Sequence, residues 1–137
     1  MSNKSRFGTY GPNVTHSWGT DVANPVLPAG VAVGPGAAYN TVALPGGQNV
    51  RAIGVTAIPN KNPGDPVSVV EFGPVTAIAD AAIARLQWVM VNAATGQLAP
   101  VGAVAGTNYE VVGLAMEAAV NQGDEFLLFV IPQRVQG

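Results

Sequence analysis

Residues 125–131 read Glu-Phe-Leu-Leu-Phe-Val-Ile, so six apolar side chains follow one carboxylate without a break. The preceding Gly123-Asp124 is typical of a polar turn that leads into a buried strand. A strand that is apolar at every position has no side suited to water. We therefore predict that Phe126–Ile131 is a strand covered on both faces.

The segment Arg85–Val91 has a different pattern, because apolar and polar residues alternate along it. Leu86, Trp88 and Met90 are expected to face one way and the residues between them the other. Trp88 could stack on a sugar or a base, but its position between two apolar neighbours predicts core packing. The next five residues end in Gly96 and read as a hairpin loop with a left-handed glycine.

Turn-forming residues divide the rest of the chain, which holds 17 glycines and 11 prolines in 137 residues. Many β-branched residues and few charged ones favour strands over helices. One short alanine-rich segment, Ala79–Ala84, has helical propensity for no more than a turn. The other predicted extended segments are Val26–Val33, Asn40–Leu44, Val50–Ile58, Pro66–Phe72, Val75–Ile78, Gln97–Val101 and Tyr109–Met116. The sequence predicts an all-β, single-domain antiparallel β-sandwich or β-barrel over residues 26–137.

Residues 1–25 are interrupted by glycine and proline and predict an extended N-terminal arm rather than strands. The arm nevertheless carries three aromatic residues, Phe7, Tyr10 and Trp18, whereas solvated tails are usually poor in aromatics. Either the arm folds back on its own domain, or its rings contact a neighbouring subunit or partner. We predict the second, with these three residues as contacts to a neighbouring subunit or partner.

Charge and residue types exclude several classes of function. Six Lys and Arg against eight Asp and Glu give a net charge of −2, so we expect no nucleic-acid partner. No apolar run reaches about 18 residues and no signal-peptide core follows the basic N-terminus, so we expect no membrane partner. With no cysteine and one histidine, we predict no metal site and no cofactor.

Patterns that would support catalysis are weak. A Ser-His-acid triad would need His16, which falls in the predicted arm, whereas catalytic groups need a rigid scaffold. The Gly-rich segments lack the context of a phosphate-binding loop. Most carboxylates fall at predicted turns or strand ends, where solvation is the default: Asp65, Glu71, Asp80, Glu110, Glu117, Asp124 and Glu125. We predict that the protein is not an enzyme and has no catalytic residue.

Residues 50–131 contain a series of short motifs: Ala52-Ile53-Gly54-Val55-Thr56, Gly64-Asp65-Pro66-Val67-Ser68-Val69, Gly73-Pro74-Val75, Ala79–Ala84, Trp88-Val89-Met90-Val91-Asn92 with Thr95-Gly96, Val112-Gly113-Leu114-Ala115-Met116-Glu117-Ala118-Ala119, and Gly123-Asp124-Glu125. Their order and spacing resemble the small capsid cement or decoration proteins of tailed bacteriophages, the DUF2190-like family. The chain departs from the family at Arg85-Leu86-Gln87, where Gly-Asp is usual, and in its longer, Pro-rich residues 1–49.

This resemblance implies a virion structural protein on the outer surface of the capsid, where it binds the major capsid protein and clamps neighbouring capsomers. It also implies a trimer, and the small number of charged residues independently favours a homo-oligomer that buries apolar surface. The alternative is a carbohydrate- or surface-binding β-module of a phage head fibre or tail accessory protein. That module would carry exposed aromatics on a rigid face rather than in an arm.

Overall fold

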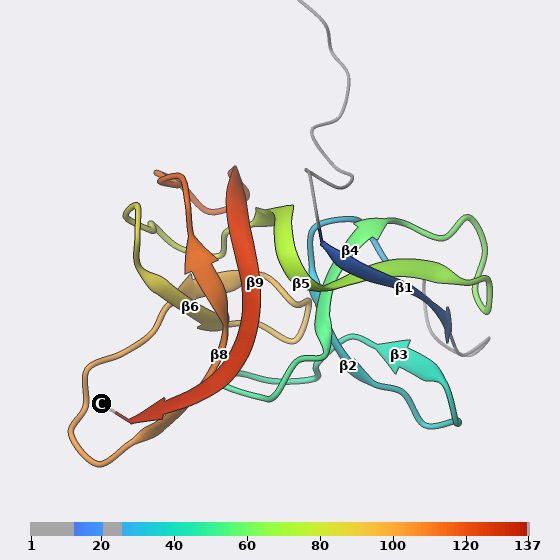
Figure 1. Ribbon diagram of the computed structural model, residues 1–137, viewed down its shortest axis with the longest axis horizontal. Coiled ribbons are helices and arrows are strands. Elements are labelled where there is room, and N and C mark those ends of the chain that lie inside the picture. Colours follow the sequence, from blue (N-terminus) through green and yellow to red (C-terminus); the bar gives the residue numbers. More distant parts are fainter. Residues whose placement is uncertain (1–12, 21–25, 137) are drawn as a thin grey trace, which may run out of the picture.

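The computed structural model describes residues 13–20 and 26–136, and these form nine β-strands (Figure 1). No helix occurs within these two ranges, in agreement with the all-β prediction. The strands are β1 (Val14–Thr20), β2 (Ala32–Pro35), β3 (Thr41–Ala43), β4 (Gly54–Ile58), β5 (Val67–Ile78), β6 (Trp88–Val91), β7 (Leu98–Pro100), β8 (Asn108–Ala115) and β9 (Glu125–Gln136).

Five strands close into a small barrel. Around the ring, β1 pairs with β3, β3 with β2, β2 with β4, β4 with β5, and β5 again with β1. Four of these pairings are antiparallel and only the short β1–β3 pairing is parallel. Because every strand in the ring has two neighbours, the barrel leaves no free edge.

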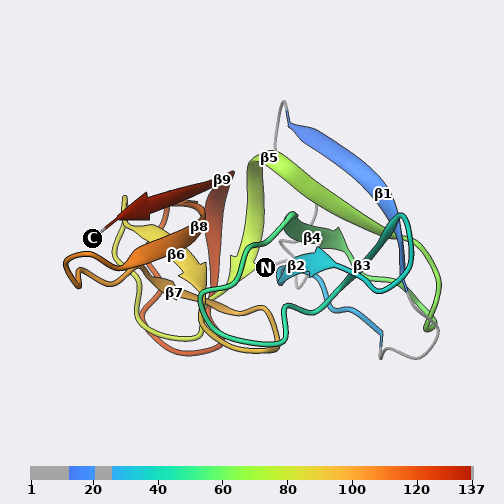
Figure 2. The ribbon, with the colours of Figure 1, turned by 90° about the horizontal axis from the view of Figure 1, so that it is seen from below.

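The second half of the fold is an open sheet in the order β5-β9-β8-β6-β7, and all its pairings are antiparallel. The long strand β5 belongs to both halves. Its residues 67–72 pair with β1 and β4, whereas its residues 73–78 pair with β9. Figure 2 shows β5 bending between the halves, and Gly73, with a φ of 111°, lies where the pairing changes.

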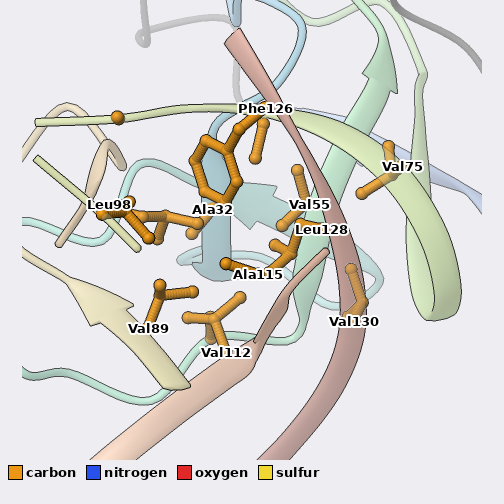
Figure 3. Packing of buried hydrophobic residues seen from close by; sticks show 14 of the residues in the cluster. Ala32, Val55, Val75, Val89, Leu98, Val112, Ala115, Phe126, Leu128 and Val130 are labelled. Atoms are coloured by element: carbon orange, nitrogen blue, oxygen red, sulfur yellow. The ribbon is translucent and has the colours of Figure 1, made fainter. Parts of the chain in front are cut away.

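The larger hydrophobic core lies between the open sheet and the outer wall of the barrel. Figure 3 shows Phe126, Leu128 and Val130 of β9 packed with Ala32 of β2 and Val55 of β4, and all five are fully buried. A smaller core fills the barrel, made of Leu27, Val33, Val42, Val67 and Val69. Adjacent residues of β5 pack into different cores: Val69 packs into the barrel core, and Val70 packs into the larger core.

The hairpin loop between β6 and β7 contacts the barrel directly. Gly96 has a φ of 83°, which confirms the predicted left-handed glycine. Its carbonyl accepts a hydrogen bond of 2.9 Å from the backbone N–H of Ala32. A Cβ at Gly96 would lie 2.4 Å from the carbonyl oxygen of Ala32, so only glycine permits this approach.

The prediction that residues 1–25 contain no strand is wrong for Val14–Thr20, which form β1 and close the barrel. Glycine and proline occur before residue 13 and again at Gly19 and Pro25, so the sequence shows no strand pattern here, although β1 runs through Gly19. The segment forms a strand because β3 and β5 pair with it on its two sides. Residues 1–12 and 21–25 lie outside the described part.

Two predictions about side-chain burial are also wrong. Trp88 is 39% exposed rather than packed in the core, because β6 turns Val89 and Val91 into the larger core and Trp88 lies on the opposite face. Strand β9 is covered on one face only: Phe126, Leu128 and Val130 are buried, while the residues between them are partly exposed. The apolar run therefore includes an outward face.

The alanine-rich segment Ala79–Ala84 forms two isolated β-bridges and no helical turn. Ala79 pairs with Leu98 and Ile83 with Ala119. Both alanine and isoleucine are buried, at 0% and 2% exposure. Tertiary contacts thus determine the backbone here, and the weak local helix propensity does not.

The hydroxyl of Thr56 is a buried polar group that joins β4 to the chain before β2. Thr56 Oγ1 donates to the Pro28 carbonyl at 2.7 Å and accepts from the Val31 N–H at 3.1 Å. Thr56→Val keeps the shape but leaves both partners unsatisfied, so we expect the free energy of unfolding to fall by about 1–3 kcal/mol. Urea denaturation measures this. Thr56→Ser keeps the hydroxyl, so its free energy of unfolding should fall clearly less. An equal decrease in both variants would contradict the prediction.

Candidate functional site

Of the three predicted contact residues, the structure describes only Trp18, because Phe7 and Tyr10 lie outside the described residues. Trp18 is half-buried on β1, opposite Val67, and packs against the barrel core. Its indole Nε1 is buried and has no hydrogen-bond partner among the described residues. Trp18 is therefore in part a core residue of the barrel.

A cavity of about 420 Å³ opens beside Trp18, and its lining combines an aromatic ring with polar groups from three elements. β1 supplies most of the lining, the turn before β3 supplies Asn40, and β5 supplies Glu71. The volume falls in the range of small-molecule sites, roughly 300–1,000 Å³. The lining residues are His16, Ser17, Trp18, Gly19, Asn40 and Glu71.

His16 forms a hydrogen bond through Nδ1 to Glu71 Oε2, which joins β1 to β5 next to this cavity. The only histidine is thus ordered beside an acid, which the sequence did not indicate. The hydroxyl of Ser17 does not complete a triad, because successive side chains of a strand point to opposite faces. The His16 side chain is 61% exposed, so water reaches it freely. We assign this pair a structural role.

A second polar cluster joins the two halves of the fold around Glu110 of β8. Arg134 of β9 donates to Glu110 Oε1 through Nε at 2.7 Å and Nη2 at 2.5 Å, and Arg51 Nε lies 3.6 Å from Oε2. Asn49 Oδ1 accepts from the Glu110 N–H at 2.9 Å. Both arginine side chains are more than half exposed, so the ion pairs contribute little stability individually.

A third feature of the surface is apolar and crosses the open sheet. Trp88 of β6 lies opposite Leu114 of β8, Leu114 opposite Phe129 of β9, and Phe129 opposite Pro74 of β5. Directly opposed residues share one face of a sheet. Trp88 is exposed, and the other three are partly exposed. We call these four residues the apolar row.

The sequence analysis missed the apolar row, although one signal for it was present. The uninterrupted run Phe126–Ile131 contains apolar residues at positions that alternate to the outer face of β9, namely Leu127, Phe129 and Ile131. A strand that faces solvent on one side normally carries polar residues there. The exception indicates an outer face suited to contact with other protein.

The described residues contain no group of three or more His, Cys, Asp or Glu side chains placed to hold a metal ion. Across residues 13–20 and 26–136, no helix is long and apolar enough to cross a membrane.

Comparison with known proteins finds a similar structure but no similar family or curated sequence. No protein-family model matches the chain, and no curated protein matches it. Membership of the DUF2190-like family therefore stays a prediction.

The fold resembles that of a solved structure. A solved structure, the N base of the head fibre gp8.5 of bacteriophage phi29, is similar with a TM-score of 0.62. The two chains are 16% identical, and the match covers 90% of this chain and 100% of the fibre base. The likeness therefore extends over both the barrel and the open sheet.

Proposed function

We propose that this chain is a non-enzymatic structural protein of a bacteriophage virion, held on the outer surface of the capsid. The observation that carries the proposal is the fold, which resembles a head-fibre base over 90% of the chain. The resemblance of the motif order over residues 50–131 to capsid decoration proteins supports the same class.

In the first form of the proposal, the protein decorates the shell as a homotrimer and clamps neighbouring capsomers by binding the major capsid protein. Contacts of this kind need exposed apolar surface and few charges that must be desolvated. The apolar row and the net charge of −2 over 137 residues meet both needs. Phe7, Tyr10 and Trp18 remain the proposed contact residues of the N-terminal part.

In the second form, the chain is the surface-binding base of a head fibre. The structural neighbour favours this form, since that protein is itself a head-fibre base. Exposed aromatics on ordered elements favour it as well: Tyr39 in the turn before β3 is 91% exposed, and Phe72 on β5 is 46% exposed. Aromatic residues in such positions are common anchors of binding surfaces.

Co-sedimentation with expanded shells of the cognate phage that lack this protein tests the proposal. We expect the chain to pellet with the shells and to stay bound between low and moderately high salt, because apolar burial is not screened by ions. Sedimentation equilibrium of the protein without shells gives the subunit number.

The temperature at which the shell breaks distinguishes the two forms. A clamp bound at many copies should raise it, whereas a fibre base at few copies should leave it unchanged. The control is the same protein mixed with unexpanded shells. Absence of binding to expanded shells would contradict both forms, and release by moderate salt would show that charged contacts dominate.

A further inference from the structure

The C-terminal part of β9 forms an open edge of the fold. β5 pairs with β9 only as far as Gly73, which lies opposite Val130. Beyond that point β9 pairs with β8 alone among the described residues, and the two strands project together from the body of the fold (Figure 1 and Figure 2). Residues 132–134 and 136 are exposed there. Within the described part of the chain, the other edge of residues 132–136 therefore has no neighbouring strand.

The ladder with β8 determines which backbone groups point to this open edge. The Asn49 side chain accepts a hydrogen bond from the Glu110 N–H at 2.9 Å and donates one to the Asn108 carbonyl at 3.1 Å, so both groups face away from β9. In an antiparallel pair, directly opposed residues either bond to each other or both face outward. Arg134 lies opposite Glu110, and Gln136 lies opposite Asn108. The N–H and C=O groups of Arg134 and Gln136 therefore point to the open edge.

A cationic cavity lies beside the same part of β9. It has a volume of about 280 Å³, and its lining includes Arg51, Glu110, Pro132 and Arg134. The two guanidinium groups share the single carboxylate of Glu110, which leaves one positive charge unbalanced. Arg51 is the less engaged of the two, because its Nε is 3.6 Å from Glu110 Oε2 and its side chain is 73% exposed. The cavity is therefore suited to a further carboxylate.

We propose that the open edge of β9 binds an extended, acidic segment of the major capsid protein as an added β-strand. The inference rests on the proposed function, which makes that protein the partner, and it adds a main-chain contact to those of the apolar row. In strand addition, main-chain hydrogen bonds give the affinity and side-chain pockets give the specificity. A residue of the added strand opposite Arg134 would share its face of the sheet, beside the cavity. An acidic residue there balances the charge of the cluster.

Two features of the edge disfavour a second copy of this chain as the added strand. The longest antiparallel pairing of two such edges is centred on Arg134 and places the two arginines opposite each other, which is repulsive. Pro132 has no N–H, so each copy also lacks one donor in that pairing. Proline and charge on an edge strand are common devices against self-association. Neither device opposes a segment that carries an acidic residue opposite Arg134.

Amide hydrogen exchange of the free protein tests the geometry of the edge. Because backbone groups alternate along a strand, the N–H groups of Gln133 and Val135 face β8, whereas those of Arg134 and Gln136 face outward. We expect the outward amides to exchange at least about ten-fold faster than the inward ones. Slow exchange at both Arg134 and Gln136 would show that the edge is already covered and would overturn the proposal.

Binding to expanded shells of the cognate phage that lack this protein tests the added strand. Gln136→Pro removes an outward N–H and leaves the ladder with β8 intact, and proline is tolerated at such an edge position. We expect the dissociation constant, measured by co-sedimentation, to rise about ten-fold. The matched control Gln136→Ala keeps the N–H and should bind like the unchanged protein. Equal binding of the two variants overturns the inference and leaves the proposed function intact.

The acidic character of the segment is tested at Arg51, which takes no part in the ladder and so gives a result even if Gln136→Pro fails to fold. Arg51→Glu should raise the dissociation constant for the shells about five-fold. Lys61→Glu makes the same change of charge in the exposed loop between β4 and β5 and should leave it unchanged. Equal effects of the two substitutions overturn the inference. Failure of the unchanged protein to bind the shells overturns the proposed function and the inference together.

Discussion

Deletion of residues 1–20 is expected to abolish the folded state at room temperature, whereas deletion of residues 1–12 is expected to preserve it. The first deletion removes β1 and leaves β3 and β5 with unpaired edges where the barrel closes. It also removes the half-buried Trp18 that packs against the barrel core, which adds to the loss of the β1 ladder. The whole free energy of unfolding of a small domain is only about 5–15 kcal/mol.

Circular dichroism and urea denaturation of the two truncated proteins measure this difference. The shorter deletion is the matched control because it removes Phe7 and Tyr10 but keeps every pairing of β1. A folded protein with near-normal melting temperature after deletion of residues 1–20 would mean that β1 is dispensable and that residues 1–20 act as an attachment arm. The structure leads us to expect the opposite.

Gly96→Ala is expected to be the most damaging single substitution among the glycines with positive φ. An added Cβ is strained by the φ of 83° and would also lie 2.4 Å from the Ala32 carbonyl oxygen. Since the Ala32 oxygen belongs to the backbone and the Cβ is fixed to it, relief requires the hairpin to move away from the barrel. We expect a loss of more than about 4 kcal/mol in the free energy of unfolding.

Gly106→Ala provides the matched control for this substitution. Gly106 has a φ of 80°, nearly the same as Gly96, but nothing lies within 4 Å of a Cβ added there. Its free energy of unfolding should fall by about 1–2 kcal/mol, which is the cost of placing alanine in the left-handed backbone conformation. Urea denaturation of both variants separates strain from steric overlap. Equal losses would show that the contact with Ala32 contributes nothing.

Local patterns predicted the strands well where short-range chemistry decides the structure. Alternation and turn residues identified the hairpin around Gly96 and placed extended segments at β4, β5 and β8. Two features depended on distant partners and were missed. Val14–Thr20 becomes a strand only because β3 and β5 flank it, and β5 is one strand in both halves because Gly73 lets it bend.

The candidate surface was harder to predict than the fold. Trp88 sits on an alternating strand, and its face is the outer one because Val89 and Val91 pack into the larger core, which no local pattern reveals. His16 and Glu71 are 55 positions apart and meet only when β1 pairs with β5. The apolar row comes from four strands, so the sequence contains its residues but not their register.

The pairing of β1 with β5 also has a consequence for synthesis on the ribosome. Val14 lies opposite Phe72, so the partner of the first strand is translated 58 residues after it. At roughly 5–20 residues per second, about 3–12 s pass between synthesis of Val14 and synthesis of its partner on β5. Within that interval β1 can pair with β3 but not with β5, so closure of the barrel is a late step in synthesis.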